Sequence, residues 1–263
     1  MCGEIDEQVV IGQEMLDRMR ATTRKLDLPE GGAPSATPQG LAEPDGRAAY
    51  MEATFREGLA RAMADISAAE EDETVDALAL RAIALARLAG YYADAIAVGV
   101  GRDFDVLFGP AYKGIPLAAG TAMTLSERGH EVGFCFNRKE TKDHGEGGSL
   151  VGCVPNDGDR VLIIEDVTTA GTSVRETVPL LRSVADVKLA GLVVSVDRME
   201  RGQGQLSALD ELRHELSMPT FAIVTLDDII THLESTERGK ALATGDLLTR
   251  IAEYRASYGA QQT

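Results

Sequence analysis

A short apolar run that ends in two acids constrains this chain more than any other feature. The segment is Val161-Leu-Ile-Ile-Glu-Asp-Val-Thr-Thr-Ala-Gly-Thr-Ser173. Residues 161–164 are apolar and mostly β-branched, which is typical of a strand covered on both faces in a parallel sheet. Beyond this segment, Val174, Val178 and Leu181 recur at helical spacing. The sequence therefore predicts a buried strand, a tight turn and a helix.

The turn between this strand and this helix has the composition of a phosphate-binding loop. Residues 168–172 would present backbone N–H groups and hydroxyls at a helix N-terminus, where the helix dipole favours an anion. Gly171 permits close approach of the backbone to a ligand. Glu165 and Asp166 are placed to hydrogen-bond ribose hydroxyls or to hold Mg²⁺, directly or through water. The alternative is an ordinary acidic turn at a strand end.

The segment 161–173 resembles the PRPP-binding motif of type I phosphoribosyltransferases, where PRPP is 5-phosphoribosyl 1-pyrophosphate. The resemblance implies the fold of that family, an open and mostly parallel α/β sheet flanked by helices. It also implies which residues of this motif bind PRPP: Glu165, Asp166, Val167, Thr168, Thr169, Ala170, Gly171, Thr172 and Ser173.

A second strand and turn is found in Phe104-Asp-Val-Leu-Phe-Gly-Pro-Ala-Tyr-Lys-Gly-Ile-Pro-Leu117. This run looks like the segment of orotate phosphoribosyltransferases that lies under the pyrophosphate of PRPP. Gly109 and Gly114 would let the backbone approach the ligand. The resemblance implies that Tyr112 and Lys113 contact PRPP. The alternative is a plain strand-to-helix turn.

A polar, glycine-rich loop follows at residues 136–148, and it carries four basic side chains, Arg138, Lys139, Lys142 and His144, within seven residues. Such a loop suits a lid over a polyanion, because closure excludes water and supplies charge. The alternative is a solvated surface loop. The run looks nearly identical to the catalytic loop of orotate phosphoribosyltransferases, which reaches across a dimer interface. The resemblance implies PRPP contacts at Arg138 and Lys139, and a catalytic role, together with Asp166, for Lys142 and His144.

A third polar run, Ser195-Val-Asp-Arg-Met-Glu-Arg-Gly202, ends another apolar strand. By resemblance to the same family, Arg198 binds the carboxylate of orotate, and Thr169 also touches the base. A guanidinium fork suits a planar carboxylate. Asp197 and Glu200 offer an alternative interpretation, in which Arg198 belongs to a local salt-bridge cluster.

The N-terminal part departs from the family pattern. The family carries there a Lys-Ser-Gly segment that supplies contacts to PRPP and orotate, and residues 1–75 lack it. Helices are predicted at 6–26 and 48–69, with a Pro- and Gly-rich linker at 29–46. We therefore expect a divergent helical region at 1–75, a phosphoribosyltransferase core at 76–235 and a helical tail at 236–263. Orotate is then bound differently, or the base is not orotate.

Composition excludes some partners. The 263 residues include 42 acids and 26 bases, a formal net charge of −16, which argues against binding to nucleic acid or to anionic membranes. There is no run of eighteen apolar residues and no visible signal sequence, so we expect a cytoplasmic protein. The cysteines, Cys2, Cys135 and Cys153, are too widely spaced for a metal-ligand pattern.

Strands are predicted near 104–108, 132–136, 161–165, 191–196 and 220–225, alternating with helices that include one at 77–97. This order predicts an open, mostly parallel sheet with its ligand beyond the carboxyl ends of the strands. Tyr92 is expected to be a core residue of the 77–97 helix.

The family resemblance implies a homodimeric enzyme that depends on Mg²⁺. It would transfer ribose 5-phosphate from PRPP to orotate, giving orotidine 5′-monophosphate and pyrophosphate in pyrimidine biosynthesis. Two alternatives stay open at this point. One is a paralogous phosphoribosyltransferase that acts on a different nitrogen base, and the other is a non-catalytic protein that senses PRPP.

Overall fold

The computed structural model describes residues 75–138, 148–168, 170–236, 240, 243 and 245–260. Its elements, in chain order, are α4 (Val75–Gly99), β1 (Val106–Phe108), α5 (Gly114–Glu127), β2 (Gly133–Asn137), β3 (Leu150–Gly152), β4 (Arg160–Val167), α6 (Thr172–Val184), β5 (Lys188–Asp197), α7 (Ala208–Leu216), β6 (Thr220–Thr225), α8 (Leu226–Ser235) and α10 (Gly245–Tyr258). The predicted N-terminal helices and the linker lie outside the described residues.

The strands form one sheet in the order β3-β2-β1-β4-β5-β6. All neighbouring pairs are parallel except β2 and β3, which pair antiparallel at one edge. The chain moves outward from β1 to β3, returns to β4 beside β1, and then moves outward in the other direction to β6. The sheet therefore has its topological switch point between β1 and β4. The predicted open, mostly parallel α/β sheet is confirmed.

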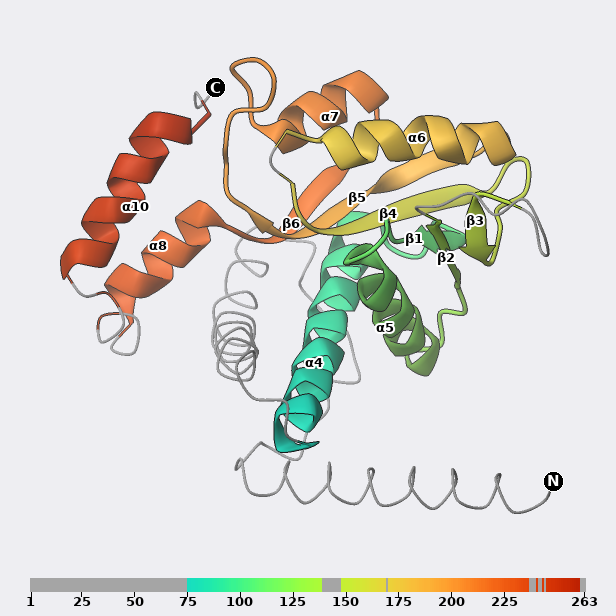
Figure 1. Ribbon diagram of the computed structural model, residues 1–263, viewed down its shortest axis with the longest axis horizontal. Helices are drawn as coiled ribbons and strands as arrows, with labels where there is room; N and C mark the ends of the chain where they lie inside the picture. Colours follow the sequence, from blue (N-terminus) through green and yellow to red (C-terminus); the bar gives the residue numbers. More distant parts are fainter. Residues whose placement is uncertain are drawn as a thin grey trace.

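Helices cover both faces of this sheet (Figure 1). Helices α4 and α5 lie on one face, and α6 and α7 lie on the other. Strand β4 shows why both faces must be covered: Leu162 and Ile164 face the α4–α5 side, whereas Val161 and Ile163 face the α6–α7 side, and all four are fully buried. Burial of each such aliphatic side chain contributes roughly 2 kcal/mol to folding.

Polar caps fix where two of the helices begin. Ser207 accepts a hydrogen bond from the backbone N–H of Asp210 (3.1 Å) and so starts α7. Thr225, the last residue of β6, forms a reciprocal capping box with Asp228, so that α8 begins without an intervening loop. Each cap satisfies N–H groups that the helix itself cannot, which is worth about 1 kcal/mol.

Helix α4 contains the segment Ala82–Gly99, which among the described residues is long and apolar enough to cross a membrane by length and composition alone. That segment also contains Arg87 and Asp94. Its residues Tyr92 and Ile96 are fully buried in the core cluster that α4 shares with α5 and the sheet. A core helix of an α/β domain passes the same test, so the finding is weak evidence for a membrane segment.

Candidate functional site

The predicted site residues that the structure describes gather at the carboxyl ends of the parallel strands. Tyr112 and Lys113 follow β1, Arg138 follows β2, and Arg198 follows β5. Glu165, Asp166 and Val167 are the last residues of β4, because this strand continues beyond the apolar run, and Thr168 and Ala170–Ser173 come next. In open α/β sheets, ligands bind outside this edge at the switch point, which here lies between β1 and β4.

The loop after β1 is locked by close backbone packing. A Cβ added at Gly109 would lie 2.1 Å from the carbonyl oxygen of Gly114, and one added at Gly114 would lie 2.6 Å from the carbonyl carbon of Gly109. The Ala111 N–H donates to Oδ1 of Asn137, at the end of β2 (2.8 Å). The peptide bond from Ala111 to Tyr112 is cis. This fixed backbone presents Tyr112, which is 70% exposed, toward solvent.

An ion pair spans the switch point. Nζ of Lys113 lies 2.8 Å from Oδ2 of Asp166, so it joins the loop after β1 to the end of β4. The hydrogen bond to Asp166, together with the negative charge of that carboxylate, raises the pKa of Lys113. The pair is too exposed to contribute more than about 1 kcal/mol to stability. It does keep a cation at the place where the sequence predicts the pyrophosphate.

Two buried hydroxyls donate to the backbone of the acidic end of β4. The Tyr92 hydroxyl, on α4, donates to the backbone carbonyl of Glu165 (2.5 Å), and the Ser195 hydroxyl, on β5, donates to the carbonyl of Asp166 (2.5 Å). Burial raises the pKa of Tyr92, so the phenol stays a neutral donor. The side chain of Ser173 donates to the Glu165 carboxylate from the other side. The direction of both acids is therefore set by side chains from three elements.

The sequence predicted Tyr92 as a core residue, and it is fully buried. Its contact with the backbone of Glu165 was not predicted. The only sequence signal was a hydroxyl at a position where phenylalanine would fill the core equally well, because a buried phenol needs a partner.

The turn after β4 has the features that the sequence predicted for a phosphate loop. Gly171 adopts a left-handed conformation (φ 70°) at the N-cap of α6, and its N–H donates to Oγ1 of Thr168 (3.1 Å). The first turn of α6 carries no acidic residue, so nothing on the helix neutralises the positive end of its dipole. The exposed hydroxyl-bearing residues Thr172 and Ser173 begin this helix. The arrangement can accept a phosphate monoester.

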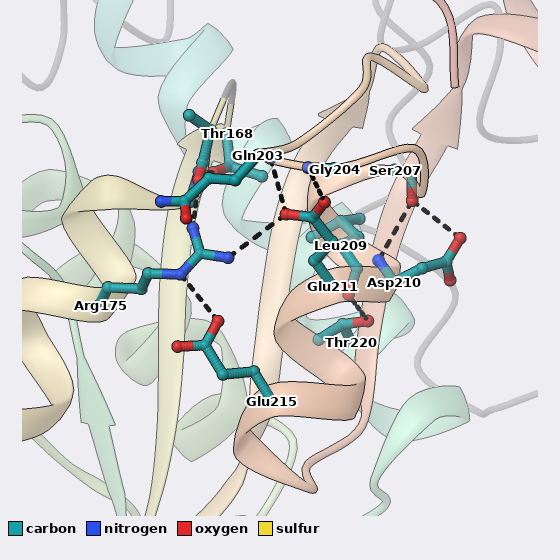
Figure 2. A network of polar contacts seen from close by, with 12 residues as sticks. Thr168, Arg175, Gln203, Gly204, Ser207, Leu209, Asp210, Glu211, Glu215 and Thr220 are labelled. Atoms are coloured by element: carbon teal, nitrogen blue, oxygen red, sulfur yellow. Dashed lines mark hydrogen bonds and ion pairs between the residues drawn. The ribbon is translucent and has the colours of Figure 1, made fainter. Parts of the chain in front are cut away.

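A half-buried arginine network supports this turn (Figure 2). Arg175 of α6 donates to the carbonyl of Ala170, and it pairs with Glu211 (3.4 Å) and Glu215 (2.7 Å) of α7. Glu211 also accepts the backbone N–H groups of Gln203 (2.8 Å) and Gly204 (2.5 Å). The network thus joins the phosphate turn to the loop that follows Arg198, and no pattern in the sequence indicated it.

Burial opposes ionisation of Glu211, but these donors outweigh it. The N–H groups of Gln203 and Gly204, followed by the Arg175 guanidinium, lower the pKa of Glu211 below its ordinary value. The carboxylate consequently stays charged. Gly202 completes the arrangement, because a Cβ there would lie 2.1 Å from Oε2 of Glu211.

In the polar run after β5, Arg198 forms a local ion pair and also stays partly exposed. Nη2 of Arg198 lies 2.9 Å from Oε2 of Glu200, whose side chain is only 7% exposed. The predicted local salt bridge therefore exists, while 37% of the Arg198 side chain stays exposed at the strand edge. Asp197 accepts the N–H of Met199 (2.8 Å) and takes no part in the ion pair with Arg198. Burial raises the pKa of Asp197.

Arg138 lies where β2 leads into the predicted lid. Its backbone N–H donates to the carbonyl of Ser149 (2.8 Å), which ties together the two ends of the segment. Its buried Nε has no hydrogen-bond acceptor in the described part of the chain. A buried guanidinium N–H normally has an acceptor, so this one favours an anionic ligand. Lys139, Lys142 and His144, and also Thr169 in the phosphate turn, lie outside the described residues.

No group of three or more His, Cys, Asp or Glu side chains converges among the residues that the structure describes. A site for Mg²⁺ does not need one, because this ion is commonly held by one or two carboxylates together with substrate phosphates and water. Glu165 and Asp166 at the open edge fit that donor set.

Comparisons with known proteins all find phosphoribosyltransferases. Residues 73–228 match the family model described as phosphoribosyl transferase domain. An orotate phosphoribosyltransferase of Clostridium beijerinckii is 54% identical over 179 residues, which cover 67% of this chain and 80% of that protein. One from Thiobacillus denitrificans is 51% identical over 175 residues, covering 66% and 78%. The crystal structure of orotate phosphoribosyltransferase from Francisella tularensis superposes with a TM-score of 0.56 at 31% identity, covering 68% of this chain and 81% of that one.

Proposed function

This chain belongs to the orotate phosphoribosyltransferases, within the phosphoribosyl transferase domain family, and from that membership we propose how its site works. It transfers ribose 5-phosphate from PRPP to orotate, giving orotidine 5′-monophosphate and pyrophosphate in pyrimidine biosynthesis. The single observation that carries the site assignment is the open edge at the β1–β4 switch point. There the uncapped N-terminus of α6, the two acids of β4 and the cation of Lys113 meet.

The phosphate turn takes the 5-phosphate of PRPP. The N–H groups at the start of α6 and the hydroxyls of Thr168, Thr172 and Ser173 face a dianion at the positive end of a helix dipole. Glu165 and Asp166 accept hydrogen bonds from the ribose hydroxyls. The buried hydroxyl of Tyr92 fixes the backbone of Glu165, so the sugar is held in one orientation before reaction.

The pyrophosphate lies between the loop after β1 and the predicted lid. Lys113 binds it by exchanging Asp166 for a phosphate oxygen, and Tyr112 and Arg138 flank it. Lys139, Lys142 and His144 complete the cationic shell from the lid. As the bond from C1 to the pyrophosphate breaks, negative charge grows on the leaving oxygen, and fixed cations stabilise it. Glu165 and Asp166 would hold Mg²⁺, directly or through water, and the bound ion would supply further positive charge against the leaving pyrophosphate.

Orotate binds at the end of β5. Arg198 presents its guanidinium to the carboxylate of the base, with Thr169 beside the ring, and a ring nitrogen attacks C1 from the face opposite the pyrophosphate. No nucleophilic side chain is required, since positioning and charge stabilisation carry the reaction. We further propose that the enzyme is a cytoplasmic homodimer in which the lid of one subunit completes the site of the other.

The test is loss of orotate absorbance with PRPP and Mg²⁺ present, together with pyrophosphate release. We expect both at equal rates in the wild-type protein. Lys142→Ala should lower kcat at least tenfold while PRPP binding stays within a few-fold, because charge stabilisation is lost mainly in the transition state. Lys188→Ala is the matched control, an exposed lysine at the opposite edge of the sheet.

Two outcomes would contradict the proposal. Unchanged turnover in Lys142→Ala would remove the lid from the mechanism. No orotate loss in a wild-type protein that still binds PRPP would mean that a different base is used. The absence of the family's Lys-Ser-Gly segment from residues 1–75 makes a screen of other nitrogen bases the next step in that case.

A further inference from the structure

The C-terminal end of the chain returns to the strand end that carries Arg198. Gly259 forms an antiparallel bridge with Glu200. The N–H of Arg201 donates to the carbonyl of Tyr258, and the N–H of Ala260 donates to the carbonyl of Met199, both at 2.9 Å. In Figure 1, the end of α10 lies beside the loop that leads into α7. We call residues 258–260 the tail.

The opposite side of the same segment is paired as well. Arg201 bridges to Ser207, and the N–H of Ala208 donates to the carbonyl of Glu200 (3.1 Å). Residues 199–201 therefore form the middle of a small ribbon, with 206–208 on one side and the tail on the other. We call this unit the base-side ribbon. Arg198, which binds the base in the proposed function, is the residue immediately before it.

Two contacts connect the ribbon to the direction of the Arg198 side chain. Glu200 lies in the middle of the ribbon, and its buried carboxylate holds Nη2 of Arg198 at 2.9 Å. Met199 has a positive φ of 55°, which a residue with a side chain rarely adopts and which must be held by its surroundings. Its N–H is held by Asp197, and its carbonyl by the N–H of Ala260.

Burial does little to attach the tail. None of the residues 246–258 of α10 is buried, and Tyr254 and Tyr258 are 37% and 57% exposed. Among the described residues, the contacts that attach this end of the chain include three polar ones. These are the bridge itself, the side chain of Arg201 on the carbonyl of Ser257, and an ion pair between Arg255 and Asp227 (2.5 Å). The backbone hydrogen bonds among these contacts join the tail to the base-side ribbon.

We propose that the tail is a positioning element of the base subsite. By forming the outer strand of the base-side ribbon, it holds Met199 and Glu200, and through them the guanidinium of Arg198, in the orientation that binds the carboxylate of the acceptor base. This inference rests on the proposed function for the identity of the base. The attachment of the tail can be measured without any substrate.

The sharpest variant is Ala260→Pro, which removes the N–H that donates to Met199. Its matched control is Ala260→Val, which adds bulk but keeps that N–H. The first readout is hydrogen–deuterium exchange of the peptide that contains the Arg201 amide, and it should become faster in Ala260→Pro only. This readout needs no substrate, so it decides the attachment whether or not orotate is the base.

The second readout is kinetic. In Ala260→Pro the KM for orotate should rise about fivefold, the factor that one hydrogen bond contributes, while the KM for PRPP changes less than about twofold. The preference for orotate over uracil, which lacks the carboxylate, should fall by a similar factor. Arg201→Gln, which removes the side-chain contact with Ser257, should act in the same direction if the proline variant folds poorly.

Three results would overturn the inference. The Arg201 amide could exchange at the wild-type rate in Ala260→Pro. Both KM values could rise together, which would indicate general loosening. The thermal midpoint could fall while the preference for orotate stays unchanged, in which case the tail is structural only. If wild-type protein does not consume orotate, the proposed function fails, and the exchange result still decides the attachment of the tail.

Discussion

Substituting Arg175 by glutamine tests whether the network behind the phosphate turn holds that turn in place. The guanidinium contacts the Ala170 carbonyl, Glu211 and Glu215, and only 18% of its side chain is exposed. A charge-assisted bond to a carbonyl is worth about 1.5 kcal/mol. The pair with Glu215 contributes less than about 1 kcal/mol, because 47% of that side chain is exposed.

Glu211 adds a contribution of intermediate size. Its side chain is 14% exposed, but it lies 3.4 Å from Arg175 and retains two backbone donors when the arginine is lost. We therefore expect Arg175→Gln to lower the free energy of unfolding by about 2–3 kcal/mol. At about 2–4 °C per kcal/mol for a domain of this size, the midpoint should fall by about 5–10 °C.

The assay is thermal and urea unfolding, followed by steady-state kinetics. Since Ala170 belongs to the phosphate turn, kcat/KM for PRPP should fall along with stability. Glu215→Gln, which removes only the exposed partner, should cost less than about 1 kcal/mol. Arg182→Gln, an exposed arginine on the same helix, should stay within about 0.5 kcal/mol of wild type.

A double-mutant cycle isolates the contact between the two helices. Arg175→Gln combined with Glu211→Gln should show a coupling of about 1 kcal/mol, within the range for residues in one network. The reasoning fails if Arg175→Gln costs no more than Glu215→Gln. It also fails if the two substitutions are additive.

Three further outcomes follow from the same structure. Tyr92→Phe should cost about 1–2 kcal/mol in urea unfolding and lower kcat/KM for PRPP, because it removes the hydroxyl that donates to the Glu165 carbonyl. Unchanged values for both would refute the contact. Folding lowers the pKa of Glu211 from the ordinary 4.5. The stability that the charged Glu211 gives the folded protein is therefore complete above pH 4.5, and it is lost as the pH falls through the lower pKa of the folded state. The stability deficit of Glu211→Gln should therefore shrink in urea titrations as the pH is lowered below 4.5, and a constant deficit would contradict this. Burial raises the pKa of Cys135 to about 12, so alkylation at neutral pH followed by mass spectrometry should modify the exposed Cys153 and leave Cys135 unmodified.

The sequence predicted those parts of the fold whose signals lie within one short segment of the chain. The β4–α6 segment contains its own strand, turn and helix signals within about 25 residues, and the resemblance placed most candidate site residues at strand ends. Strand β3 was not predicted, because Leu150–Gly152 has no pattern of its own and is a strand only through pairing with β2.

Contacts between distant parts of the chain could not be predicted in the same way. Tyr92 and Glu165 are 73 residues apart, and Arg175 and Glu211 are 36 apart. The local sequence around each of these residues does not indicate its distant partner, which is fixed only when the helices have packed on the sheet. The pairing of Gly259 with Glu200 belongs to the same class.

The packing of Gly109 against Gly114 has a consequence for how this enzyme can change over evolutionary time. Neither position has room for a Cβ, so steric contacts set the path of the loop, and both positions must remain glycine for the loop to keep this path. Tyr112 and Lys113, on the same loop, are 70% and 82% exposed and bear little of the fold's stability. Under the proposed function, in which Tyr112 and Lys113 contact PRPP, substitutions at these two positions alter what the loop binds while leaving its shape intact. Laboratory evolution of donor preference can therefore begin there at small thermodynamic risk.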